Sequence, residues 1–286
     1  MRGVSLEFDG LRLRGFSRAG DETWFRVDPP GLALDVGRGA GPLVGVQWIF
    51  LSHGHLDHSL GLPWLLSQRK LQGLDPPTVF CPAEISRDVA EFVRSASCLE
   101  GPAAESEPEF QLVGLEPGDS RSLTQDLRLE TFASSHVVPS LGCHLVRSVE
   151  RLKACYSGRT PDQVAELKSS GETVVDREDE VEMSYCGDTG PDIFGSEPRI
   201  FEAKTLLIEC TFAGSETEHL GTSFGHLHIR DFVDNAKRFR NKAIVLSHLS
   251  RRHRAAEFER EVQRLLPDLF SRIRFVPGTG RSVGGR

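Results

Sequence analysis

Residues 51–62, LSHGHLDHSLGL, carry four candidate metal ligands within six positions: His53, His55, Asp57 and His58. The stretch follows the apolar run VQWIF at 46–50 and precedes a segment with helical spacing, so it lies where a strand is expected to end. A turn at a strand end brings imidazole and carboxylate groups together, and these groups are common ligands of transition-metal ions. Because such a polar cluster is costly unless something binds it, the stretch predicts a site for one or two metal ions.

Strand-like and helix-like runs alternate on both sides of this stretch. Strands are expected at 6–16, 22–28, 31–37, 46–52, 78–81, 113–116, 127–132, 143–149, 183–186, 205–212 and 243–250. Helices are expected at 61–73, 84–99, about 229–239 and 255–270. The polar segment 154–182, which ends in the acidic run DREDEVE, is expected to form an exposed excursion. This order predicts a layered α/β domain with polar groups at the strand ends.

The composition excludes several classes of protein. The chain has 286 residues, of which 38% are hydrophobic and 26% are charged, so it can form a sizeable core and is not expected to be disordered. No apolar run approaches the roughly 18–20 residues of a membrane-spanning helix, and the N-terminus lacks the apolar segment of a secretory signal. The six cysteines are scattered without a C-x-x-C pair, which favours reduced thiols in a cytoplasmic protein with no membrane partner.

Charge is distributed unevenly along the chain. The net charge of −7 argues mildly against non-specific binding of nucleic acid. Residues 226–286 nevertheless contain 14 Lys and Arg against 6 Asp and Glu. Charge alone leaves two interpretations open, a solvated arginine-rich face and a surface that binds phosphates.

The pattern H-x-H-x-D-H after an apolar strand resembles the metal signature of the metallo-β-lactamase superfamily, whose fold is a four-layered αββα sandwich. The resemblance implies one domain of this type over residues 1–286. It also implies three further ligands, each after a strand-like run: His136 in LETFASSHVVPSLG, Asp188 in MSYCGDTG and His248 in AIVLSHLS. Together and in this order, the ligands are far more specific than any one of them alone.

Within this superfamily, the local motifs resemble those of ribonuclease Z (tRNase Z), most of all its short, plant-type form. SSHVVPSLGCHL and LSHLSRRH resemble two of its motifs, with Cys143 and His253 in place of aromatic residues. The segment IECTF and the dipeptide Gly225-His226 resemble its Glu–His pair. The likeness extends from about Gly15 to Phe275. It implies a zinc-dependent, homodimeric endoribonuclease that removes the 3′ trailer of precursor tRNA.

The resemblance also implies a role for each motif residue. One Zn²⁺ would be held by His53, His55 and His136 and a second by Asp57, His58 and His248, with Asp188 bridging both; Mn²⁺ or another divalent ion is an alternative. Asp57 would also act as general base. His226, oriented by Glu209, would donate a proton to the leaving ribose oxygen, although His228 is a rival two residues further on.

Three more residues complete the set of implied roles. Arg252 and Ser250, beside the last ligand, would contact the RNA, and the basic C-terminal stretch would then be a phosphate-binding surface. Asp35 would accept a hydrogen bond from a ligand imidazole and fix its tautomer, or it would simply be a turn residue before Gly37.

The chain departs from the family before the bridging aspartate. Many members carry a long Gly/Pro-rich arm there, whereas His136 and Asp188 lie only 52 positions apart and segment 154–182 is acidic, so a reduced arm is expected. An alternative function is hydrolysis of a small substrate, a phosphodiester or thioester, since the same ligands serve either reaction. A non-catalytic RNA-binding relative is a third possibility, which is disfavoured because every ligand position is filled.

Overall fold

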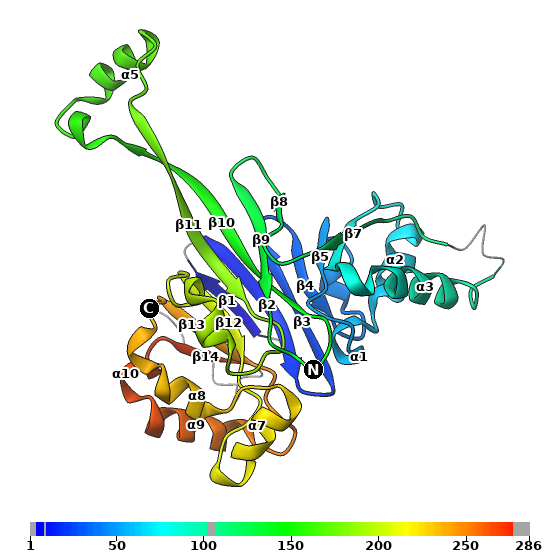
Figure 1. Ribbon diagram of the computed structural model, residues 1–286. Coiled ribbons are helices and arrows are strands. Elements are labelled where there is room, and N and C mark those ends of the chain that lie inside the picture. Colours follow the sequence, from blue (N-terminus) through cyan, green and yellow to red (C-terminus); the bar gives the residue numbers. More distant parts are fainter. Residues whose placement is uncertain (1–3, 9, 102–106, 277–286) are drawn as a thin grey trace.

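Two seven-stranded sheets form the centre of the protein (Figure 1). The computed structural model describes residues 4–8, 10–101 and 107–276. The N-terminal sheet contains, in spatial order, β1 (Val4–Phe8), β2 (Leu11–Arg18), β3 (Glu22–Asp28), β4 (Leu32–Val36), β5 (Trp48–Phe50), β6 (Thr78–Pro82) and β7 (Gln111–Leu115). Strands β1 to β4 are antiparallel neighbours, and β4 to β7 run parallel.

The C-terminal sheet follows the same plan. It contains, in spatial order, β8 (Ser120–Ser122), β9 (Leu127–Ala133), β10 (Leu141–Leu152), β11 (Val175–Tyr185), β12 (Thr205–Glu209), β13 (Ala243–Ser247) and β14 (Ile273–Phe275). Strands β8 to β11 are antiparallel, and β11 to β14 are parallel. Because parallel strands end at the same edge of a sheet, the turns after them gather on one side of each sheet.

The helices of the described residues are α1 (Leu56–Ser59), α2 (Leu62–Leu71), α3 (Ser86–Ser97), α5 (Pro161–Ser169), α6 (Ile193–Ser196), α7 (Glu218–Phe224), α8 (Ile229–Asp234), α9 (Ala255–Leu265) and α10 (Pro267–Phe270). Helices α2 and α3 pack on the outer face of the N-terminal sheet, and α8, α9 and α10 pack on that of the C-terminal sheet. Single 3₁₀ turns lie at Gly41–Leu43, Ala83–Ile85, Ala154–Tyr156, Pro198–Phe201, Ser215–Thr217 and Ala236–Arg238. Within the described ranges, no helix is both long and apolar enough to cross a membrane.

Three apolar clusters hold these layers together. Leu13, Phe25, Leu207 and Val245 belong to the cluster between the two sheets. A second cluster packs α2 and α3 on the N-terminal sheet, and a third packs α8, α9 and α10 on the C-terminal sheet (Figure 1). The layers therefore follow the order helix, sheet, sheet, helix, which confirms the αββα sandwich expected from the sequence.

Two expected helices are shorter than their periodicity predicts. The helix expected at 229–239 ends at Asp234, because the Asn235 side chain donates a hydrogen bond to the carbonyl of Asp231 at 2.9 Å and a 3₁₀ turn follows. The helix expected at 255–270 is broken into α9 and α10 at Leu266, which adopts φ −127° and ψ 54°. A residue before proline avoids the helical region, so Pro267 imposes this break.

The expected excursion contains a two-stranded ribbon with a helix at its tip. Beyond Arg147, β10 no longer pairs with β9, and residues 148–152 and 175–179 form a two-stranded ribbon that projects from the body and carries α5 at its tip (Figure 1). The acidic run 176–182 belongs to β11. Its carboxylates lie against basic side chains, for example Arg151–Glu178 at 2.8 Å and Lys204–Glu180 at 2.7 Å. Such pairing, which involves residues distant in sequence, neutralises the acidic run.

The tip is expected to be dispensable for folding. None of the residues of α5 is buried, and the Tyr156 hydroxyl donates its hydrogen bond to Glu172 within the tip itself. Replacing residues 154–173 with Asn-Gly, a dipeptide suited to a two-residue hairpin turn, should therefore leave the melting temperature within about 3 °C of the wild-type value. Thermal unfolding followed by circular dichroism measures this, and a fall of about 10 °C would show that the tip packs against the body.

Candidate metal centre and active site

The turn after β5 supplies four of the expected site residues. β5 ends at Phe50, and α1 begins at Leu56, so that Asp57 and His58 lie in a first helical turn. The side chains of His53 and His58 are fully buried. Those of His55 and Asp57 are partly exposed, so one side of the cluster is open to substrate.

Residues that follow strands of the C-terminal sheet lie next to the turn after β5. Asp188 follows β11 and is buried, with one oxygen 3.4 Å from His58 Nε2 and the other 3.3 Å from His248 Nε2. The second oxygen is also 3.7 Å from His53 Nε2. His136, which follows β9, places Nε2 3.4 Å from His55 Nδ1. Asp188 thus faces ligand atoms contributed by both sheets.

Among the described residues, three overlapping groups could each hold a metal ion. They are His53, His55, His136 and Asp188; Asp57, His58 and His248; and Asp188, Glu209, His226 and His248, and in each group the candidate ligand atoms lie within 4.8 Å of one another. The buried Nε2 atoms of His53 and His58 have no hydrogen-bond partner in the described part of the chain. A buried imidazole nitrogen without a partner is costly, and coordination of a metal ion removes that cost. Nitrogen and carboxylate donors in this number suit zinc and similar divalent ions.

Asp35 lies directly behind His58. Its carboxylate accepts hydrogen bonds from His58 Nδ1 at 2.7 Å, the Ser52 amide at 2.7 Å, the Ser52 hydroxyl at 2.8 Å and the Tyr185 hydroxyl at 2.5 Å. Asp35 is fully buried and has a positive φ of 55°. These bonds fix the His58 tautomer with Nε2 directed at the cluster. This geometry favours Asp35 as a hydrogen-bond acceptor for the candidate metal ligand His58 over a role as a simple turn residue.

Other groups behind the ligands carry no clear sequence signal. The Thr211 hydroxyl lies 3.1 Å from His248 Nδ1, and the carbonyl of Gly225 accepts a hydrogen bond from His136 Nδ1 at 3.0 Å. Thr211 is two residues after Glu209 in IECTF, and its position beside that glutamate is the only hint available from the sequence. Tyr185 was also missed, although it is one of only two tyrosines in the chain.

The Glu209–His226 pair lies against the cluster. Glu209 Oε1 accepts a hydrogen bond from His226 Nδ1 at 2.7 Å and another from the Thr189 amide at 2.8 Å. The His226 ring centroid is 5.1 Å from that of His136 and 5.2 Å from that of His248. Burial lowers the pKa of His226, but the charge and hydrogen bond of Glu209 outweigh this and raise the pKa to about 9. The Glu209 carboxylate therefore favours the protonated form of the His226 imidazole.

The rival, His228, has both ring nitrogens engaged elsewhere. Nδ1 accepts a hydrogen bond from the Arg230 amide at 3.1 Å, and Nε2 donates to the carbonyl of Gly214 at 3.0 Å. His228 thus caps the start of α8. Its side chain supports the backbone near the site, and it belongs to none of the groups that could hold a metal.

The two expected RNA-contacting residues lie at the outer side of the site. Ser250 is buried, and its hydroxyl accepts a hydrogen bond from the Arg252 amide at 3.3 Å. The Arg252 side chain is exposed, and within the described ranges it forms no ion pair or side-chain hydrogen bond with the cluster. Arg252 is thus exposed to solvent, four residues after His248 along the chain.

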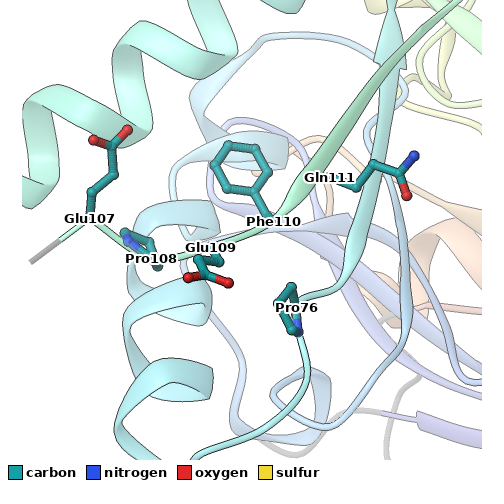
Figure 2. Close-up of a pocket in the computed structure, with 6 residues that line it drawn as sticks. All are labelled: Pro76, Glu107, Pro108, Glu109, Phe110 and Gln111. Atoms are coloured by element: carbon teal, nitrogen blue, oxygen red, sulfur yellow. The ribbon is translucent and has the colours of Figure 1, made fainter.

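A separate surface hollow of about 740 Å³ contains none of the expected site residues. It is lined by Pro76, Glu107, Pro108, Glu109, Phe110 and Gln111, between the segment after α2 and the start of β7 (Figure 2). The two glutamates repel a polyanion, so this hollow is not suited to binding RNA.

Asp35 is expected to control metal affinity. In Asp35→Ala, His58 loses its buried acceptor, and zinc affinity should fall by about 10- to 100-fold. Competition with a chromogenic chelator measures the change, and Asp28→Ala serves as a control because Asp28 pairs with Arg26 at 2.7 Å, away from the cluster. Equal zinc affinities in the three proteins would contradict a role for Asp35 in holding His58.

Comparisons with known proteins agree with this geometry. The profile of the Beta-lactamase superfamily domain matches residues 36–249. The chain is 32% identical over 273 residues to tRNase Z TRZ1 of Arabidopsis thaliana, covering 94% of this chain and 96% of that protein. It is 30% identical over 277 residues to the chloroplastic tRNase Z TRZ2 of the same plant, covering 95% and 76%.

Solved structures share the fold at lower sequence identity. The metallo-β-lactamase fold protein YhfI of Bacillus subtilis superposes with a TM-score of 0.63 at 14% identity, covering 95% of this chain and 98% of that one. The short form of human tRNase Z superposes with a TM-score of 0.58 at 19% identity, covering 91% and 93%. Taken with the plant relatives, these matches show that the chain belongs to the tRNase Z (ribonuclease Z) family of the β-lactamase superfamily.

Proposed function

We propose that this protein is a zinc-dependent endoribonuclease that removes the 3′ trailer of precursor tRNA. The observation that carries the proposal is the Glu209–His226 pair, held at 2.7 Å against the metal-binding groups. A phosphodiester bond needs a proton on its leaving ribose oxygen, and this pair supplies a donor beside the residues that would bind the phosphate. The similarity to tRNase Z proteins over nearly the whole chain supports tRNA as the substrate class.

Two Zn²⁺ ions fit the ligand groups, with Mn²⁺ or another divalent ion as an alternative. His53, His55 and His136 would hold one ion and Asp57, His58 and His248 the other, with Asp188 between them. Bound metal would supply charge to polarise the scissile phosphate and would make the attacking water more acidic.

Asp57 is proposed as the general base. Burial raises the pKa of its carboxyl, but the hydrogen bond from His248 and the charges of His58 and His248 hold this pKa well below its usual range. Asp57 is therefore ionised at neutral pH and can accept the proton of the attacking water. Its partial exposure keeps the carboxylate in reach of solvent on the open side of the cluster.

His226 is proposed as the general acid. With its pKa raised to about 9, the imidazole keeps its proton over the physiological range and donates it from Nε2 to the leaving oxygen. Glu209 accepts at Nδ1 and so fixes the ring orientation, while Thr189 and Leu227 amides hold the Glu209 carboxylate.

Arg252, with Ser250 beneath it, is proposed to contact RNA phosphates next to the cut. The exposed guanidinium suits a bidentate contact to phosphate oxygens, and A-form RNA is recognised mainly through its backbone and shape. The basic C-terminal stretch extends this surface, although Arg281 and Arg286 lie outside the described residues.

We further propose that the protein is a homodimer in the cytoplasm. Leu56, Leu60 and Trp64 are 63%, 45% and 43% exposed and lie four residues apart along α1 and α2, which gives an apolar face that a second copy would cover. All six cysteines are free, as is usual in a reducing compartment.

The second candidate is a hydrolase of a small phosphodiester or thioester. The same ligands would serve that reaction, because neither the fold nor the metal groups select a substrate. It is favoured if the zinc-loaded protein turns over a chromogenic phosphodiester and cuts no RNA.

The first test is incubation of zinc-loaded protein with an end-labelled precursor tRNA that bears a 3′ trailer. We expect one cut just after the discriminator nucleotide. Asp57→Ala should reduce the rate about 10²- to 10⁴-fold because the general base is lost. Asp88→Ala is the matched control, because it removes an exposed carboxylate in the first turn of α3, and this variant should cleave precursor tRNA at the wild-type rate. Full activity in Asp57→Ala protein, or cleavage at unrelated positions, would contradict the proposal.

The Glu209–His226 pair makes a prediction about pH. Glu209 raises the pKa of His226, so the acid is available until the pH rises through about 9. In Glu209→Gln the charge is lost while burial still lowers the pKa, so the basic limb of the kcat profile should move to lower pH, with kcat reduced about 10²-fold. Single-turnover rates from about pH 6 to pH 9.5 measure this, with exposed Glu202→Gln as control. An unchanged basic limb in Glu209→Gln would exclude His226 as the acid.

A further inference from the structure

Four consecutive residues at the β2–β3 turn contact both sides of the candidate site. Ser17, Arg18, Ala19 and Gly20 each make one hydrogen bond to it. Three of these bonds reach residues 248–253. Ser17 Oγ accepts from the His248 amide at 2.8 Å, Arg18 Nη2 donates to the His253 carbonyl at 3.0 Å, and the Ala19 amide donates to the Leu249 carbonyl at 3.3 Å. The fourth runs from the Gly20 amide to Asp57 Oδ2 at 2.9 Å.

The segment links residues that belong to different sheets. Asp57 follows β5 of the N-terminal sheet, whereas the loop 248–253 follows β13 of the C-terminal sheet. The turn between β2 and β3 holds the carboxylate of Asp57 through one amide and the loop through three neighbouring residues. The distance between the proposed general base and the proposed RNA-contacting loop is thus set through one short piece of backbone.

The loop needs such support because it begins in an unfavourable conformation. His248 has a positive φ of 57°, which non-glycine residues rarely adopt and which persists only where the surroundings fix it. Ser17 holds the His248 amide, and its own hydroxyl lies 3.0 Å from Thr23 Oγ1, so the buried acceptor is itself fixed. Arg18 then holds the far end of the loop at His253.

We propose that Ser17–Gly20 is a positioning clamp that holds the loop 248–253, and with it Arg252, in register with Asp57. Arg18 is the key residue because it bonds to the carbonyl of His253, the residue next to Arg252. Arg18 acts through the loop and does not itself touch the RNA. The effect on tRNA rests on the proposed function, whereas the effect on the loop does not.

The experiment compares Arg18→Ala with Arg14→Ala, an exposed arginine on the same strand, in the zinc-loaded full-length protein. Because a hydrogen bond from a charged donor is lost, Arg18→Ala should raise KM for precursor tRNA about tenfold. Changes in kcat, and in turnover of bis(p-nitrophenyl) phosphate, should stay within about twofold. Zinc content and melting temperature should match those of the wild type. Amide hydrogen exchange in residues 249–254 should be faster in Arg18→Ala and unchanged in Arg14→Ala.

A double-mutant cycle separates action through the loop from direct contact. In an Arg252→Ala background, Arg18→Ala should change KM by less than about twofold, because the residue that the clamp positions is already missing. Equal increases in KM in both backgrounds would mean that Arg18 contacts RNA itself, and this overturns the proposal. Arg18→Lys retains a donor and should restore part of the affinity, which keeps the test valid if Arg18→Ala proves unstable.

Amide hydrogen exchange tests the clamp without any RNA substrate. If exchange in residues 249–254 is the same in wild-type and Arg18→Ala protein, the clamp is overturned whatever happens to tRNA. If wild-type protein cuts no precursor tRNA, the proposed function fails, while faster exchange in Arg18→Ala would still support a clamp on the loop.

Discussion

The carboxylate of Asp188 is the constraint on which the rest of the structure depends. It is fully buried, which by itself raises the pKa of its carboxyl, yet the charges of His248 and His58 hold this pKa well below its usual range. A buried carboxylate is tolerated only with compensating partners placed around it. Those partners come from both sheets, so the apolar cluster between the sheets must hold the two strand edges within hydrogen-bonding distance of one another.

Much of the fold is readable from the local sequence, because β4, β6, β12 and β13 are short apolar runs buried along their whole length, while helices such as α3 and α9 bury one face. Periodicity predicted the wrong helix ends where one side chain or one proline terminated the helix. Asn235 stops a helix by bonding to the backbone of Asp231, and Pro267 breaks another, although the apolar spacing continues through both. The acidic run of β11 could not be recognised as a strand, because its stability depends on basic side chains such as Lys204 that are distant in sequence.

The candidate site likewise contains residues that the sequence predicts and residues that it does not. The candidate metal ligands are recognisable because they combine a compact motif with strand ends, and the family resemblance gives their order along the chain. The groups behind them are harder to find. Tyr185 and Thr211 are ordinary polar residues whose importance lies only in where the fold places their hydroxyls. The Gly20 amide has no side-chain signal at all, since any residue but proline offers the same donor.

The supporting bonds repeatedly cross from one sheet to the other. Asp35, on β4, supports His58 of its own sheet but is itself held by Tyr185 of the opposite sheet. His248, from the C-terminal sheet, is held by Ser17 of the N-terminal sheet. Separation of the two sheets would therefore break these supporting bonds and also open the apolar cluster between the sheets. Since metal binding and folding share these contacts, occupation of the site would also stabilise the sandwich.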